Sequence, residues 1–186
     1  ASGEAERVRI AFLTSELAPL AQSGGLGEAV RGLALELARR GHELTVCMPA
    51  HRRALRSTAL PPLEEGPTST LDLGGRSLSV RWGTGRMDEG PRLALLECPE
   101  LFDRDGLYGE DGRAYPDEGL RFVAFSRAAA ELCAAERPDV VVAHDWHAAL
   151  APALLVERHG LRDLATVQVV HNAAYQGLLP ASELPS

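Results

Sequence analysis

The sequence predicts an α/β fold, a Rossmann-like doubly wound parallel sheet with an antiparallel hairpin insertion. In the amino-terminal third, a continuous apolar run at residues 8–13 is followed by a helix-like segment at 26–40 and a second apolar run at 43–48. Two further short apolar runs lie in the carboxyl-terminal half. Strands of this kind are buried on both faces, as in a parallel sheet covered by helices. The 186 residues, 45% of them hydrophobic, suffice for a single domain with a substantial core.

The first helix is expected over residues 26–40 because its apolar side chains recur at intervals of three and four. They would form one side that packs on the sheet: Val30, Leu33, Ala34, Leu37 and Ala38. Gly41 stands where a glycine commonly follows the end of a helix. Together with the runs on either side, this helix predicts a βαβ unit.

The middle of the chain has a different character. Residues 68–73, 76–82 and 92–97 are short strand-like runs separated by glycine-containing turns, a pattern that predicts antiparallel hairpins. Residues 101–116 contain several Asp and Gly, so we expect a loop with little regular structure. A loop of this length inside a compact domain is usually functional or mobile.

The remaining elements return to alternating helix and strand. We expect a helix over residues 117–137, a strand over 139–143, a helix over 146–159 and a final strand over 165–170. Pro138 would end the first of these helices. This order completes a parallel sheet flanked by helices.

Composition narrows the range of partners. The net charge is −7 and all nineteen basic residues are arginine, with no basic stripe, so we expect neither a nucleic-acid nor a membrane partner. Cys47, Cys98 and Cys133 are widely spaced and odd in number, which indicates neither a disulfide framework nor a zinc site. Without a signal peptide or an apolar run of about 18 residues, the expected location is cytoplasmic.

The segment between the first strand and the first helix contains Gly24 and Gly25. Free N–H groups and the positive end of the dipole make a helix start suitable for a phosphate, and glycine lets a ligand approach the backbone closely. A sharp turn from strand to helix would explain the same glycines. The order is not G-x-G-x-x-G, and no Lys-Ser/Thr of a P-loop follows, so neither an NAD site nor an ATPase is predicted.

Polar side chains follow three of the predicted parallel strands. Glu16 follows the first, residues 144–147 follow the fourth, and residues 171–177 follow the last. Ligands bind beyond the carboxyl ends of such strands, so we expect one shared site there. Asp145 could cap the next helix, alone or alongside a ligand role, and His171 could be a structural histidine. No metal site is predicted, and a hydrolase G-x-S-x-G motif is absent.

Four segments together resemble bacterial glycogen synthase and plant starch synthase. They are Thr14-Ser15-Glu16-Leu17-Ala18-Pro19 with Gly24-Gly25-Leu26-Gly27-Glu28, Leu101-Phe102-Asp103-Arg104 through Tyr108, His144-Asp145-Trp146-His147-Ala148, and Val170-His171-Asn172-Ala173-Ala174-Tyr175-Gln176-Gly177. The segments occur in the family's order with its approximate spacing and cover nearly the whole chain.

The resemblance implies two Rossmann-like domains that face each other across a cleft. This chain, residues 1–186, resembles only the first of them, and the nucleotide-binding second domain would be the missing partner. The implied activity is retaining transfer of glucose from ADP-glucose to the non-reducing end of an α-1,4-glucan, with neither cofactor nor metal. We therefore expect a single amino-terminal domain that is inactive alone.

The resemblance also implies roles for particular residues of this sequence. Backbone N–H groups would bind the diphosphate, and a backbone carbonyl beside the transferred sugar would face its cationic centre. The expected residues are catalytic His171 and Asp145, donor-binding Gln22, Gly24, Gly25 and Asn172, and acceptor-binding Glu16, Tyr108, Tyr175 and Gln176.

One position departs from the family pattern. The family has a lysine two residues before the paired glycines, where this chain has Gln22. Loss of a charge-assisted hydrogen bond to phosphate costs about 1.5–3 kcal/mol. A non-catalytic glucan-binding or regulatory homologue is therefore the alternative prediction. A transferase that makes sucrose is disfavoured by the His-Asp-Trp-His and Tyr-Gln-Gly segments.

Overall fold

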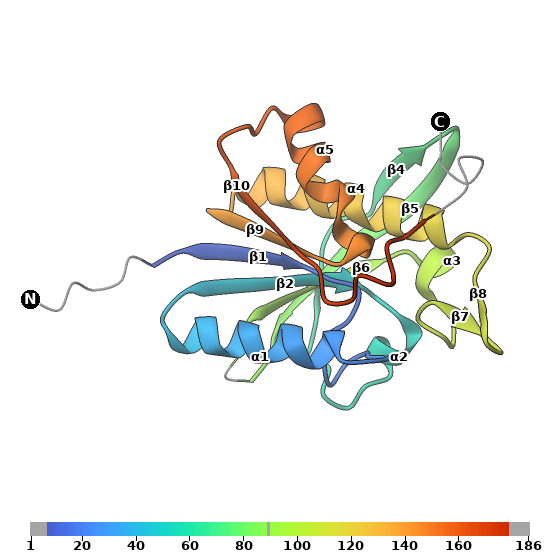
Figure 1. The fold of residues 1–186 in the computed structure, drawn as a ribbon, viewed down its shortest axis with the longest axis horizontal. Coiled ribbons are helices and arrows are strands. Elements are labelled where there is room, and N and C mark those ends of the chain that lie inside the picture. The colour runs from blue at the N-terminus through green and yellow to red at the C-terminus, as the bar shows by residue number, and fades with distance from the viewer. Residues whose placement is uncertain (1–6, 89, 179–186) are drawn as a thin grey trace, which may run out of the picture.

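Five parallel strands form the centre of the protein, in the order β10-β9-β1-β2-β6 (Figure 1). The computed structural model describes residues 7–88 and 90–178, so both ends of the domain expected over residues 1–186 lie outside it. The strands are β1 (Arg9–Leu13), β2 (Glu43–Pro49), β6 (Arg92–Glu97), β9 (Val140–His144) and β10 (Ala165–Val169).

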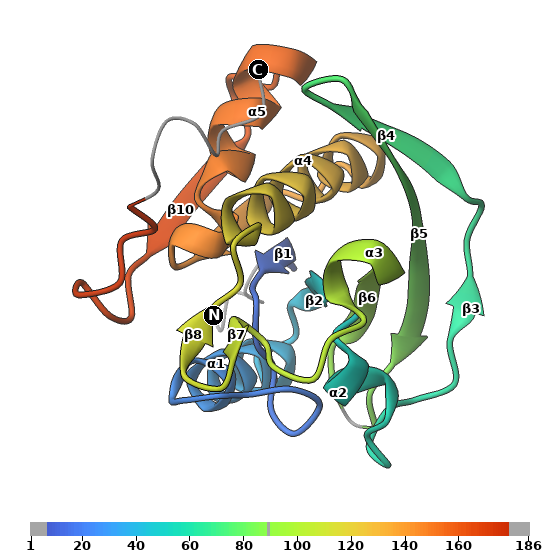
Figure 2. The same cartoon turned by 90° about the vertical axis from the view of Figure 1, so that its right-hand side faces the viewer.

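Helices cover both faces of this sheet (Figure 2). The helix α1 (Leu26–Arg39) packs on one face, while α4 (Glu118–Glu136) and α5 (Leu150–His159) pack on the other. Side chains alternate along β1: Phe12 belongs to the core beneath α1, whereas Leu13 belongs to the core beneath α4. The predicted doubly wound architecture is confirmed, and the continuous apolar runs are explained by burial on both sides.

An antiparallel extension lies beside β6, as predicted. The long strand β5 (Arg76–Arg86) pairs antiparallel with β6, and β4 (Ser69–Leu73) and β3 (Glu64–Glu65) pair antiparallel with β5. Residues 92–97 pair antiparallel with β5, as predicted, but β6 also pairs in parallel with β2, which was not predicted. Its four central side chains, Leu93 to Leu96, are fully buried, as in an interior strand.

The segment expected to have little regular structure is more ordered than predicted. It begins within α3 (Pro99–Phe102) and contains the short strand pair β7 (Gly109–Glu110) and β8 (Arg113–Ala114). A fully buried Arg121 on α4 holds it: its Nε donates to the Leu101 carbonyl at 2.8 Å, and its guanidinium lies 5.0 Å from the Tyr115 ring centroid. Burial lowers the pKa of Arg121 to about 10, so the guanidinium stays charged at neutral pH.

Two further helical segments differ from the prediction. The short helix α2 (Arg52–Leu55) follows β2 and was not expected. The helix expected over residues 146–159 begins as a 3-10 turn, Trp146–Ala148, before α5 starts at Leu150. Pro152 explains the change, because it has no N–H to continue an α-helix from that turn and is tolerated only in the first turn of α5.

The order of the strands fixes where ligands bind. From β1 the chain builds outward through β2 to β6, and it then returns to the other side of β1 to form β9 and β10. The carboxyl ends of β1 and β9 are therefore neighbours at the point where the direction of winding reverses. Ligands of open α/β sheets bind in the crevice at this switch point.

A substitution at Gly27 tests how closely the first turn of α1 packs against the preceding loop. A Cβ there would lie 2.9 Å from the Gln22 Cβ and 3.1 Å from the Ala18 backbone nitrogen. We expect Gly27→Ala to lower the free energy of unfolding by about 1–3 kcal/mol, measured by urea denaturation. The control is Gly32→Ala on the same helix, where nothing lies within 4 Å and a gain of about 0.5–1 kcal/mol is expected. Equal effects at both positions would contradict the close packing.

Candidate active site

The buried carboxylate of Glu16 organises the loop after β1. Only 3% of the residue is exposed, and its carboxylate accepts hydrogen bonds from the backbone N–H (2.9 Å) and hydroxyl (2.8 Å) of Ser23. It also accepts from the Tyr108 hydroxyl at 2.7 Å and, at 3.4 Å, from the Gly24 N–H. These donors satisfy a charge that would otherwise be costly to bury. Glu16 therefore ties the glycine turn to the segment that carries Tyr108.

Tyr108 is held from two sides. Its hydroxyl donates to Glu16 and accepts from the Ser15 hydroxyl at 2.7 Å, while its ring stacks on His147 with centroids 4.8 Å apart. Burial and the nearby Glu16 charge raise the pKa of Tyr108 well above its usual value, so the phenol stays neutral. The structure thus joins Glu16 and Tyr108, both predicted on the acceptor side, by a direct hydrogen bond.

The paired glycines face open space at the start of α1. At both Gly24 and Gly25, nothing lies within 4 Å of the position that a Cβ would occupy, and Gly25 has an ordinary φ of −78°. Neither glycine has a positive φ, so the two residues keep the backbone open to a ligand and do not serve a left-handed turn. The Gln22 side chain instead lies against Gly27, and its Oε1 is buried without a hydrogen-bond partner among the described residues.

Asp145 adopts an unusual backbone conformation just after β9, with φ 56° and ψ −176°. This region is essentially restricted to glycine and costs about 1–3 kcal/mol at any other residue. The Asp145 Oδ1 accepts a hydrogen bond from the His171 backbone N–H at 2.7 Å and makes no cap bond to the following turn. The alternative of a helix-capping aspartate is therefore wrong, and the carboxylate positions the predicted catalytic histidine.

Three histidines around these residues are buried and uncharged. His51 donates from Nε2 to the Ser15 carbonyl at 3.1 Å, His144 ends β9, and His147 stacks on Tyr108. Burial lowers the pKa of His51 and of His144 to about 4 and that of His147 to about 3. Their rings are neutral at pH 7. His171 meets this group through a 2.9 Å contact between its Nε2 and the His144 Nδ1.

The segment after β10 is the exposed side of the site. The Asn172 Oδ1 accepts from the Ala174 N–H at 3.0 Å, and the Gln176 Nε2 donates to the Ala173 carbonyl at 2.8 Å. Tyr175 is 73% exposed. The predicted residues of this segment therefore lie beside His171 without joining the buried network.

Several residues of the site were not found from the sequence. Ser15, Ser23 and His51 hold the loop through the bonds described above, and although Ser15 lies within a segment that carries the family resemblance, none of the three was assigned a role from the sequence. Arg53 of α2 donates from Nη1 to the Gln22 carbonyl at 3.0 Å. The adjacent pair Arg52-Arg53, which follows β2, was the one available signal, since it marks a further carboxyl end of the sheet.

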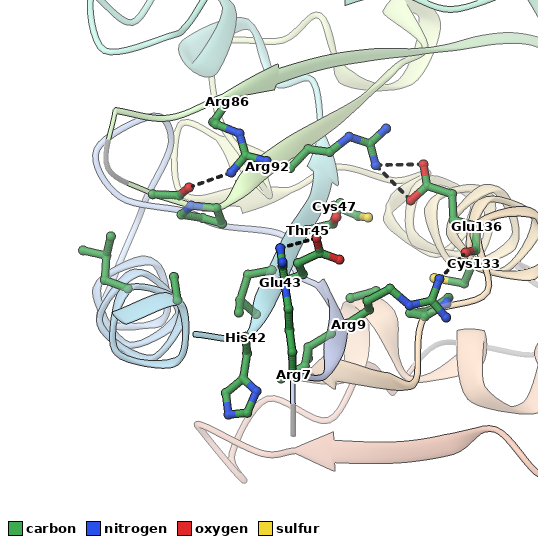
Figure 3. Close-up of a pocket in the computed structure, with 18 of the residues that line it drawn as sticks. Arg7, Arg9, His42, Glu43, Thr45, Cys47, Arg86, Arg92, Cys133 and Glu136 are labelled. Atoms are coloured by element: carbon green, nitrogen blue, oxygen red, sulfur yellow. Dashed lines mark hydrogen bonds and ion pairs between the residues drawn. The ribbon is translucent and has the colours of Figure 1, made fainter. Parts of the chain in front are cut away.

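A cavity of about 950 Å³ lies at the opposite edge of the sheet (Figure 3). Arg9, Glu43 and Arg92 line it at the amino ends of the parallel strands, as do Arg39 and Glu136 at the carboxyl ends of α1 and α4. Its arginines are mostly engaged in ion pairs, among them Arg92 with Glu136 at 2.8 Å. The negative ends of two helix dipoles also disfavour an anion there. The cavity is therefore poorly suited to an anionic ligand such as a diphosphate.

Within residues 7–88 and 90–178, no group of three or more His, Cys, Asp or Glu side chains is arranged to hold a metal ion. In the same part of the chain, no helix is both long and apolar enough to cross a membrane.

Comparison with known proteins identifies the class to which this fold and site belong. The family model described as the starch synthase catalytic domain matches residues 9–186, so the chain belongs to that family. Among solved structures, the catalytic domain of starch synthase IV from Arabidopsis thaliana, bound to ADP and acarbose, is similar with a TM-score of 0.79 and 29% identity. The match covers 96% of this chain and 36% of that one.

Among curated relatives, the chain is similar to bacterial glycogen synthases. It is 42% identical to that of Bordetella petrii, over 89% of this chain and 32% of the relative. It is also 42% identical to that of Ralstonia nicotianae, over 93% of this chain and 32% of the relative. The chain thus spans about a third of the length of these relatives, and the family resemblance predicted from the sequence is confirmed.

The buried histidines predict a loss of stability in mild acid. Folded-state pKa values of about 3 to 4 lie below the ordinary value of 6.5, so the unfolded chain binds protons first as the pH falls. Their stabilisation is complete above pH 6.5 and declines towards pH 4. We expect the free energy of unfolding in urea to fall between pH 7 and pH 5 by about 2 kcal/mol for each ring that stays buried. His51→Gln should flatten this dependence; an unchanged slope would show that His51 is not buried as neutral imidazole.

The Glu16 network predicts a specific stability effect. In Glu16→Gln, an amide NH₂ replaces one acceptor oxygen and faces groups that are themselves donors. We expect a loss of about 1–3 kcal/mol in urea denaturation. Tyr108→Phe, which removes one donor and keeps the ring, should cost less. In the double variant the two losses should be less than additive; full additivity would mean that the two side chains do not interact.

Proposed function

We propose that this chain forms the amino-terminal, acceptor-side part of a retaining glucosyltransferase of the glycogen and starch synthase type. The donor would be ADP-glucose, and the acceptor the 4-hydroxyl at the non-reducing end of an α-1,4-glucan. The observation that carries the proposal is the 2.7 Å bond from the His171 N–H to Asp145, which brings the two expected catalytic residues together at the switch point of the sheet. The chain's place in the starch synthase family supports the same reaction.

The reaction needs a group beside the anomeric carbon and donors for the departing diphosphate. Transfer proceeds through an oxocarbenium-like transition state, which partial negative charge stabilises. In the proposed mechanism the backbone carbonyl of His171 faces this cationic centre, and Asp145 holds that stretch of backbone in place. The strained conformation of Asp145 fits such a role, since strain persists at sites where geometry serves function.

The donor side is assigned to the start of α1. The Gly24 and Gly25 backbone N–H groups, with the positive end of the helix dipole behind them, would meet the diphosphate. Open space beside both glycines supports this assignment. Gln22 cannot supply a charge, but the Arg53 guanidinium at the Gln22 carbonyl lies next to the same turn. Asn172 would contact the donor from the other side of the crevice.

The acceptor side is assigned to two kinds of residue. Tyr175 and Gln176 are exposed and available for direct contact with a glucan. Glu16 is almost completely buried, so its part in acceptor binding is to hold Tyr108. Aromatic and amide side chains suit a carbohydrate, because they combine an apolar face with hydrogen bonds at defined positions.

The proposed enzyme extends beyond this chain. The chain spans about a third of its relatives, and the second domain, which binds the nucleotide in the family, would complete the cleft. The isolated domain would then have little activity. Cys47, Cys98 and Cys133 are all buried free thiols, which supports the proposal that the protein works in the cytoplasm.

A non-catalytic glucan-binding or regulatory homologue is the second candidate. The substitution of the family lysine by Gln22 favours it, because a neutral carboxamide binds a diphosphate less well than a charge-assisted donor does. The two candidates agree on glucan binding and differ on transfer.

The decisive variant for catalysis is His171→Ala in the complete enzyme that contains this chain. We expect transfer of glucose from ADP-glucose to a maltooligosaccharide to be lost while the protein still folds, because the residue is exposed and no core side chain is removed. Transfer is measured as the radiolabel incorporated into the maltooligosaccharide from labelled ADP-glucose. The control is His159→Ala on α5, which lies away from the crevice and should retain activity.

The results of these experiments distinguish the glucosyltransferase from the non-catalytic homologue. Retained activity in His171→Ala would refute the role of that residue. If the unaltered enzyme binds a maltooligosaccharide, seen as NMR shifts near Tyr108 and Asp145, and yet transfers no glucose, the non-catalytic homologue is the better account. If a folded chain responds to neither maltooligosaccharide nor ADP-glucose, the proposed function fails.

A further inference from the structure

A direct contact between two imidazole rings stands behind the proposed catalytic residue. The His144 Nδ1 lies 2.9 Å from the His171 Nε2, and the ring planes differ by 27° with centroids 5.2 Å apart. A short nitrogen-to-nitrogen distance at this centroid separation means that the rings meet edge to edge in a hydrogen bond. One nitrogen must carry the proton and the other must accept it, because two neutral imidazoles share one proton in such a bond.

We propose that His144 is a positioning residue, which donates from Nδ1 to the His171 Nε2 and so fixes His171 as the tautomer that carries its proton on Nδ1. The direction of this hydrogen bond and the tautomer of His171 follow from the geometry of the two rings and their surroundings. Its consequence for transfer rests on the proposed function, in which His171 lies beside the sugar.

The surroundings of His144 favour this direction of donation. His144 is fully buried, its ring packs edge-on against Phe12 with centroids 4.8 Å apart, and its Nε2 is buried without a partner among the described residues. If His171 were the donor, the proton of His144 would sit on that Nε2 as a buried, unpaired N–H, which is rare in proteins. With His144 as the donor, only a lone pair remains unpaired.

His51 shows the same arrangement in this molecule. Its Nε2 lies 3.1 Å from the Ser15 carbonyl, which can only accept, so His51 must donate there. Its other ring nitrogen, Nδ1, is then a buried lone pair, and it too has no partner among the described residues. The fold thus already tolerates an unpaired imidazole lone pair, while placing the N–H on the nitrogen that has an acceptor.

Burial also keeps His144 neutral. It lowers the pKa of His144 to about 4, with a further contribution from His171, so His144 does not take part as a cation at neutral pH. The Asp145 carboxylate fixes the other end of the arrangement through the His171 backbone N–H at 2.7 Å. Asp145 therefore holds the backbone of His171, and His144 holds its ring.

The consequence is a defined donor on the exposed side of His171. With Nε2 occupied as the acceptor, Nδ1 carries the only ring proton, and no described residue takes it up. His171 would therefore offer an N–H to an oxygen of the substrate, such as a sugar hydroxyl. A free neutral histidine prefers the opposite tautomer, with the proton on Nε2, so the protein must impose this one.

The ring nitrogens of the unaltered 186-residue chain test the proposal directly. In a long-range ¹H–¹⁵N spectrum above pH 7, the His171 Nδ1 should have the shift of a protonated nitrogen, and the Nε2 that of a nitrogen with a lone pair. The spectrum of His171→Gln identifies the signals. A protonated Nε2 on His171 in the unaltered chain would by itself overturn the proposal.

Matched variants test the role of His144. In His144→Leu the donor is gone, so His171 should revert mainly to the Nε2-protonated tautomer. In His144→Asn the amide NH₂ lies close to the position of Nδ1 and should keep His171 protonated on Nδ1. His159→Leu, the same change on α5, should have no effect. Backbone amide spectra confirm that each variant folds. If His144→Leu does not fold, the tautomer of His171 in the unaltered chain and in His144→Asn still tests the proposal.

The effect of these variants on catalysis is measured in the complete enzyme that contains this chain. We expect kcat for glucosyl transfer to fall about 10- to 100-fold in His144→Leu with little change in the KM for the glucan, and to recover in His144→Asn. Equal losses in both variants would refute a positioning role. If the complete enzyme transfers no glucose, the proposed function fails, while the tautomer of His171 is still measured independently.

Discussion

The site depends on burying one negative charge, the carboxylate of Glu16. Taking an ionised group out of water is costly unless donors surround it, and Ser23, Gly24 and Tyr108 provide them. Because these donors come from segments far apart in the sequence, satisfying the charge also brings those segments together. The loop after β1, the start of α1 and the segment before α4 are held in one arrangement by a single requirement for hydrogen bonds.

The histidines extend this arrangement across the switch point. His147 stacks on Tyr108, and His144 contacts His171, so neutral aromatic rings lie between the Glu16 network and the end of β10. A neutral ring can be buried at lower cost than a charged one and still offers a directed N–H. The region around the proposed catalytic residues is therefore rigid on its buried side and open on the side that would meet substrate.

Much of the fold could be predicted from the sequence because it follows from local patterns. The strand-helix-strand order and the apolar runs predicted β1, α1, β2, β9 and β10, since period and burial are properties of consecutive residues. The parallel pairing of β6 with β2 could not be predicted, because it depends on which strand becomes the neighbour after a long excursion. The site residues were named by resemblance, whereas Ser15, Ser23, His51 and His144 act through contacts that only the folded chain creates.

The backbone of Asp145 has a consequence for how this protein can change. Its φ of 56° and ψ of −176° suit glycine, which would relieve about 1–3 kcal/mol of strain and remove the carboxylate that holds the His171 N–H. A single codon change could thus make the domain more robust while it loses the geometry proposed for transfer. The backbone conformation alone therefore gives folding no reason to keep an aspartate at this position, and what the aspartate adds is its hydrogen bond to the His171 N–H.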